Sequence, residues 1–149
     1  MSNDYYCIQI DFGTPEFDEA LKLRYEVLRK PLHMEFDPDD ISKEFDSYHI
    51  ACYHKSTQEL AAFLILKPVS HQVLKMRQVA VDPHLQSAGI GSFLVAESES
   101  FAKKHHYQKI ELHARDTAVD FYKKNGYQSS GSIFQEVGID HLFMSKTLK

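Results

Sequence analysis

The sequence predicts a single α/β domain in which a mixed sheet carries helices on both faces. Its 149 residues are the length of one ordinary domain. Apolar residues make up 43% of the chain and charged residues 26%, the balance of a globular protein with a buried core. Strand-like runs alternate with helical patterns, and no repeat or linker-like stretch divides them. We therefore expect residues 1–149 to form one domain.

The first expected elements are a strand and a helix. Residues 5–11 alternate enough between apolar and polar side chains to form a strand. Thr14 is a suitable N-cap for the helix that follows, and Pro15 suits its first turn. Apolar side chains then recur at helical spacing to about Arg29, where Pro31 is expected to end the helix.

The middle of the chain is expected to supply three strands. Residues 31–42 contain the run DPDD and are expected to form a loop with a short helical turn. Residues 48–54 and 60–67 flank a polar turn, which is typical of a hairpin. Residues 73–81 are expected to form the central strand.

The last part of the chain alternates helices and strands again. A long helix is expected over residues 89–106. In the strand expected over residues 109–114, apolar and polar side chains alternate, which places Glu111 and His113 together on the polar face. The remaining elements are a short helix over residues 116–124 and strands over 128–137 and 141–147.

Composition argues against several classes of function. The net charge of −4 disfavours non-specific nucleic-acid binding, and no apolar run is long enough for a membrane helix. The N-terminus has no basic, apolar signal-like segment. Cys7 and Cys52 lie in strand-like runs and are expected to be unbridged, which fits a cytoplasmic protein. Nine histidines occur without metal-ligand spacing, so no metal site is expected.

A glycine-rich hexamer, QSAGIG at residues 86–91, stands between the central strand and the long helix. Glycine lets the backbone approach a ligand closely. The first peptide N–H groups of a helix have no helical partner and lie at the positive end of its dipole. Together these features suit a phosphate or pyrophosphate, so we expect a phosphate-bearing cofactor here.

Two common phosphate-binding motifs do not fit the hexamer. A P-loop needs Gly-Lys-Ser/Thr, whereas Gly91 is followed by Ser92 and a phenylalanine. A dinucleotide fingerprint needs a third small residue where Leu94 stands. No repeated βαβ unit supports that second motif either.

The hexamer resembles the Q/R-x-x-G-x-G/A loop of the GCN5-related N-acetyltransferases, the GNAT superfamily. VAVDP at residues 79–83 resembles the family's strand and Asp-Pro turn, and AVDFYKKNGY at 118–127 resembles its A-x-x-F-Y-x-K-x-G-F/Y segment. LRKPL at 28–32 and EVGIDH at 136–141 are similar to the ElaA-like branch. The resemblance covers nearly the whole chain and implies the GNAT fold, whose central sheet is largely antiparallel.

The resemblance implies that acetyl-CoA donates an acetyl group directly to an amine in a ternary complex. Backbone atoms of the central strand would pair with the pantetheine arm, and the loop amides would hold the pyrophosphate. A backbone N–H near Ala80 or Val81 would stabilise the oxyanion. The residues implied in cofactor binding are Val79, Ala80, Val81, Gln86, Ser87, Ala88, Gly89, Ile90, Gly91, Ser92 and Phe121.

Tyr122 is the catalytic acid that the resemblance implies, because a phenol can protonate the thiolate that leaves. The resemblance does not identify the general base, since the central strand has no carboxylate where some family members carry a glutamate. His113 and Glu111 share one strand face and are our candidates. Other candidates are His49, Asp46 and His141, and a water relay to the base is equally open.

The sequence leaves the acceptor open. The acidic run at residues 37–40 would attract a cationic amine. Arg24, Arg29 and Arg77 would equally meet an anionic group. A small-molecule amine is our first expectation and a protein amine the second. A catalytically silent acyl-CoA-binding module also stays open, as does a homodimer like those of many relatives.

Overall fold

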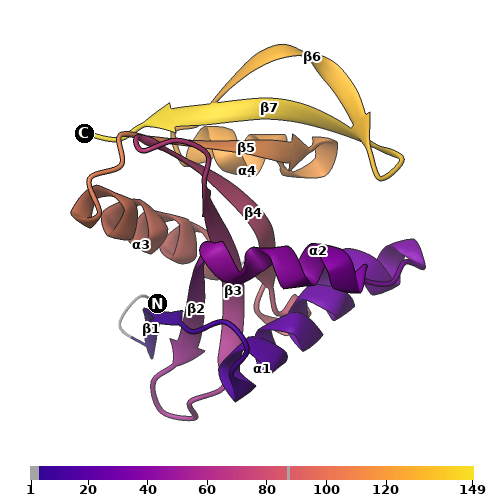
Figure 1. Ribbon diagram of the computed structural model, residues 1–149, viewed down its shortest axis with the longest axis vertical. Coiled ribbons are helices and arrows are strands. Elements are labelled where there is room, and N and C mark those ends of the chain that lie inside the picture. Colours follow the sequence, from indigo (N-terminus) through magenta and orange to yellow (C-terminus); the bar gives the residue numbers. More distant parts are fainter. Residues whose placement is uncertain (1–3, 87) are drawn as a thin grey trace.

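A computed structural model describes residues 4–86 and 88–149. It contains a seven-stranded sheet with the order β1-β2-β3-β4-β5-β7-β6 (Figure 1). Neighbouring strands are antiparallel except β4 and β5, which run parallel. The strands are β1 (Tyr5–Ile10), β2 (Tyr48–His54), β3 (Leu60–Pro68), β4 (Val73–Val81), β5 (Lys109–Arg115), β6 (Gln128–Glu136) and β7 (Ile139–Thr147).

Helices cover both faces of this sheet, as the sequence predicts. Figure 1 shows α3 on one side of β2, β3 and β4, and the α1–α2 segment on the other. The α-helices are α1 (Pro15–Arg24), α2 (Pro38–Ser42), α3 (Ile90–Lys104) and α4 (Val119–Lys124). Over the described part of the chain, none of them has the length and apolar character that crossing a bilayer requires.

Strand β3 separates two hydrophobic cores because it is buried on both faces. Leu64 and Leu66 belong to the larger core, which also holds Leu94 of α3. Phe63 and Ile65 belong to the smaller core on the α1 face. The alternation of a strand therefore distributes one continuous apolar run between both layers of helices.

The first helix differs from the expectation in how it ends. Thr14 caps α1 as predicted, since its Oγ1 accepts a hydrogen bond from the backbone N–H of Phe17 at 3.3 Å. The chain then winds as a π-helical turn, η2 (Tyr25–Arg29), and as a 3-10 turn over Lys30–Leu32. Pro31 lies within that turn and does not end the helical path, because a first-turn N–H needs no helical partner.

The sheet opens between β4 and β5. These strands pair only from Val73 with Lys109 to Met76 with Leu112. Just beyond, the pairing of β4 with β3 shifts register, and Gln78 takes a left-handed backbone conformation with φ of 56°. Such a bulge bends a strand away from its partner. It leaves this edge of β4 without a strand partner after Met76 in the described part of the chain.

Candidate active site

A cavity of about 340 Å³ lies where β4 and β5 separate. Met76 and Tyr122 line it from the side of the larger core. Lys75, Arg77 and His113 line it from the opposite side, because neighbouring residues of a strand point to opposite faces. The cavity therefore connects the two faces of the sheet through the opening.

The predicted phosphate loop leads directly into α3. Gly89 precedes the helix in a left-handed conformation with φ of 82°, and a Cβ placed there would meet no atom within 4 Å. Among the described residues no side chain caps helix α3, and its first turn has no acidic residue, so its first N–H groups stay available to an anion. Gln86, Ala88 and Ile90 flank Gly89, whereas Ser87 lies outside the described residues.

Gly91 allows α4 to pack closely on this loop. A Cβ at Gly91 would stand 3.2 Å from two ring atoms of Phe121. Ser92 is tied to the same region, because its Oγ accepts a hydrogen bond from Asn125 Nδ2 at 3.3 Å. Phe121 therefore supports the loop through packing, and its contact with the cofactor stays a prediction.

The end of β4 connects the loop to the cavity. Val79 lines the cavity just after the bulge, whereas Ala80 is buried opposite Phe63. The side chain of Gln86 returns to this strand and donates a hydrogen bond from Nε2 to the carbonyl of Val81 at 3.2 Å. Val79 and Val81, which are predicted to pair with the pantetheine arm, thus stand between the loop and the opening.

Tyr122 is buried in α4 and forms part of the cavity wall. Its ring contacts those of Phe121 and Tyr127, with centroids 5.0 and 5.8 Å away. Burial raises the pKa of Tyr122 to about 12. The phenol is therefore protonated at neutral pH, and it is a weaker acid than the ordinary phenol that the sequence argument assumed.

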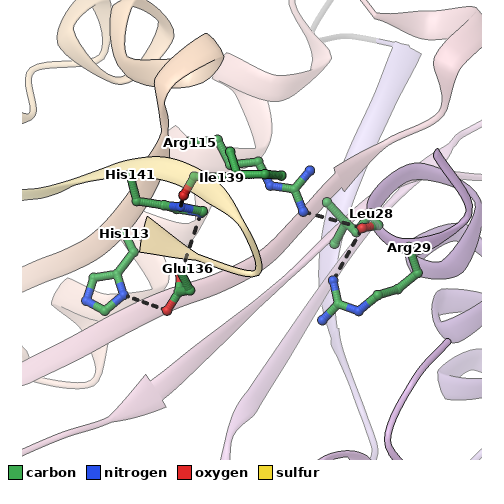
Figure 2. A network of polar contacts seen from close by, with 7 residues as sticks. All are labelled: Leu28, Arg29, His113, Arg115, Glu136, Ile139 and His141. Atoms are coloured by element: carbon green, nitrogen blue, oxygen red, sulfur yellow. Dashed lines mark hydrogen bonds and ion pairs between the residues drawn. The ribbon is translucent and has the colours of Figure 1, made fainter. Parts of the chain in front are cut away.

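Glu136 joins two histidines on the opposite side of the cavity (Figure 2). Its Oε1 lies 3.2 Å from Nδ1 of His113, and its Oε2 lies 3.6 Å from Nε2 of His141. Nδ1 of His141 is 2.8 Å from the carbonyl of Ile139, which only accepts, so this nitrogen carries the hydrogen. If His113 donates Nδ1–H to Glu136, its Nε2 is left with the lone pair that a base requires.

The other candidate bases lie elsewhere. Glu111 shares the face of His113, but it lies beside Lys75 and does not line the cavity. His49 is buried in the core, where its Nε2 donates a hydrogen bond to the carbonyl of Glu44 at 2.8 Å. Desolvation lowers the pKa of His49 and so favours its neutral form. Asp46 ends the short turn before β2 and is also outside the cavity wall.

The three arginines that could meet an anionic acceptor lie in two different environments. Arg24 is buried and forms two hydrogen bonds of 2.8 Å with the carboxylate of Glu44. Arg29 and Arg77 line the cavity. Asp40 alone of the acidic run lines it as well. Across residues 4–86 and 88–149, no group of three or more His, Cys, Asp or Glu side chains is placed to hold a metal ion.

Comparison with known proteins identifies the family. The model of the acetyltransferase (GNAT) domain matches residues 20–148. The uncharacterised protein YyaT of Bacillus subtilis strain 168 is 30% identical over 137 residues, which cover 89% of this chain and 90% of YyaT.

Two crystal structures show the same fold at low identity. ElaA of Escherichia coli superposes with a TM-score of 0.78 at 19% identity, over 95% of this chain and 99% of ElaA. A GNAT acetyltransferase of Elizabethkingia anophelis with acetyl-CoA bound gives a TM-score of 0.74 at 17% identity, over 98% and 99% of the two chains. Placement within the ElaA-like branch stays a prediction. The chain belongs to the GNAT acetyltransferase family.

Proposed function

We propose that this protein transfers an acetyl group from acetyl-CoA to a primary amine of a small molecule. One observation carries the proposal: the opening between β4 and β5 joins Tyr122 on one face to His113 on the other, and the β4 segment that leads from it is hydrogen-bonded to Gln86 of the glycine loop. A donor and an acceptor that enter from opposite faces would meet in this opening. The fold shared with the acetyl-CoA-bound Elizabethkingia protein supports this choice of donor.

The residues present fit a pyrophosphate and a pantetheine arm. The first N–H groups of α3, which no side chain of the described residues caps, would bind the pyrophosphate, and the space beside Gly89 is open. The free edge of β4 near Val79 would pair with the amides of the pantetheine arm, as an added strand does. The thioester of acetyl-CoA would supply the activated acyl group.

The groups that handle protons in the proposed reaction lie on opposite faces of the sheet. His113 Nε2 takes a proton from the acceptor ammonium, and the free amine nitrogen then attacks the thioester carbonyl. A backbone N–H of β4 near Ala80 or Val81 stabilises the oxyanion, an effect worth about 3 kcal/mol. The C–S bond breaks while the Tyr122 hydroxyl donates a hydrogen bond to the departing thiolate. The second proton of the amine nitrogen, released as the amide forms, is taken up by that sulfur through solvent, so CoA leaves as the thiol.

Substitution of Gly89 with glutamate is expected to weaken acetyl-CoA binding roughly 30-fold, because a carboxylate beside the pyrophosphate adds about 2 kcal/mol of repulsion. Calorimetric titration of acetyl-CoA measures this effect. Gly89→Gln is the matched control, since both side chains adopt the same φ of 82° and differ only in charge. Equal binding by the two variants would place the pyrophosphate elsewhere, and no binding by the unmodified chain would refute the donor.

The His113→Asn variant is expected to lower kcat/KM about 100-fold near neutral pH, because an amine that is still protonated needs a base. The deficit should shrink as the pH approaches the pKa of the amine, since a free amine attacks without one. Glu136→Gln should show a smaller deficit with the same pH dependence, because Glu136 orients the ring of His113 and does not itself take the proton. A deficit that does not change with pH would assign His113 a structural role.

A further inference from the structure

Four cationic side chains line the cavity on the face of His113. Arg29 comes from the η2 turn, Lys75 and Arg77 from β4, and Arg115 from β5. In residues 4–86 and 88–149, no carboxylate lies within 4 Å of any of these four cations. The buried Arg24 shows the contrast, because Glu44 neutralises it fully.

Arg29 and Arg115 donate hydrogen bonds to the same carbonyl oxygen, which holds them next to each other. Figure 2 shows both guanidinium groups directed at the carbonyl of Leu28, to which they donate at 3.4 and 3.3 Å. A guanidinium has five N–H donors, so most of them stay free for a ligand. Burial lowers the pKa of Arg29, and the nearby charges of Arg24, Arg115 and Arg77 lower it further, whereas Asp40 opposes them.

This cationic group lies on the wrong face to serve the CoA phosphates. Lys75 and Arg77 point away from the face on which Leu74 and Met76 contact the larger core with α3. On β5, Arg115 shares the face of His113 and opposes the buried Ala114. The glycine loop begins α3 and belongs to the other layer, so the cations face the acceptor.

The acceptor side is therefore bipolar. Glu136 lies with His113 and His141 at one part of the wall, where an ammonium finds a carboxylate and a base. Arg29 and Arg115 lie at another part and present guanidinium donors, which bind carboxylates in a bidentate manner. Few small molecules match both parts other than an amine that also carries an anionic oxygen group.

We propose that the acceptor is a small amine bearing a carboxylate, which Arg29 and Arg115 bind while the amine lies toward His113 and Glu136. This inference rests on the proposed acetyl transfer and adds the substrate class. Lys75 and Arg77 add positive potential that draws the anion into the cavity.

The test compares amines with and without the anion, with each rate expressed per free amine. Glycine, β-alanine and γ-aminobutyrate are each measured against their carboxamides, and 2-aminoethylphosphonate tests whether a phosphonate replaces the carboxylate. At least one amino acid should have a kcat/KM roughly 10- to 100-fold above that of its carboxamide, the range expected for a charge-assisted pair. Preference for the phosphonate, or equal rates for each pair, would overturn the carboxylate assignment.

Substitution of the two arginines then tests whether they cause the preference for a carboxylate. The Arg29→Gln/Arg115→Gln variant should lose it, with roughly a 10- to 100-fold drop for the amino acid and little change for the carboxamide. Lys30→Gln is the matched control, because Lys30 is exposed, pairs with Glu26 and does not line the cavity. An equal drop for both amines would overturn the proposed role of the two arginines.

Binding measured without turnover separates this inference from the proposed function. Each amine is titrated by calorimetry into the protein saturated with CoA. Preferential binding of the amino acid with no acetylation of any amine would support the anion site and contradict the transferase. Acetylation without any preference for the carboxylate would support the transferase and contradict the anion site.

Discussion

Replacement of Tyr122 with phenylalanine is expected to lower kcat roughly 10²- to 10⁴-fold and to leave acetyl-CoA affinity nearly unchanged. The change removes only the hydroxyl, so the ring keeps its contacts with Phe121 and Tyr127. Burial holds the phenol pKa at about 12, above the value of about 8.5 for a thiol. The hydroxyl therefore acts mainly by hydrogen-bonding the thiolate as the C–S bond breaks, an interaction made only in the transition state.

Tyr127 offers a matched control for this experiment. It is a buried tyrosine in ring contact with Tyr122, but its hydroxyl donates to Glu99 Oε2 at 3.0 Å and it does not line the cavity. Tyr127→Phe should cost about 1 kcal/mol of stability and leave kcat unchanged. Steady-state rates and calorimetry on both variants measure the two effects. If the rates of Tyr122→Phe and Tyr127→Phe are alike, Tyr122 has no part in the chemistry.

The parts of the fold set by local pattern could be predicted from the sequence. The central strand begins at Val73 and ends at Val81 as expected, because a valine-containing strand segment lies between residues that favour turns. Alternation likewise placed His113 on the polar face of β5, away from the buried Leu112. Such features depend on side chains within a few residues of each other.

The parts set by contacts between distant segments were missed. In the sequence, Glu136 stands out only as part of a run similar to one branch of the family, which does not predict a role for it. In the structure it meets His113 because β7 inserts between β5 and β6. The hairpin register pairs it with Ile139 at the turn. Nothing in the local sequence indicates that insertion. The left-handed Gln78 was also unforeseen, since glutamine has no special preference for such a backbone.

The π-helical turn has a similar origin. Residues 25–29 continue the apolar spacing of α1, so the sequence predicts a plain α-helix there. In the structure this turn brings the Leu28 carbonyl and Arg29 to the cavity. A π-turn shifts the side chains that follow it around the helix axis, and such turns are common at functional sites. The site therefore departs from local preference on the side that we propose binds the acceptor.

The ion pair that anchors this turn gives the second large effect. Glu44→Gln is expected to lower the free energy of unfolding by about 3–5 kcal/mol, because it leaves the Arg24 guanidinium buried without a countercharge. The guanidinium also lies over the rings of Phe36 and Phe63, with centroids 5.1 and 5.8 Å from its carbon, and the residue is almost completely buried. Urea unfolding monitored by circular dichroism measures the loss.

Two further variants separate burial from charge. Glu26→Gln removes an equivalent carboxylate from the exposed pair with Lys30 and should cost less than about 0.5 kcal/mol. Arg24→Met/Glu44→Leu removes both buried charges and should recover most of the stability lost in Glu44→Gln. If that double variant is stable yet binds the acceptor poorly, the ion pair holds η2 in the geometry that presents Arg29. If Glu44→Gln costs no more than Glu26→Gln, water reaches Arg24 and the pair does not anchor the turn.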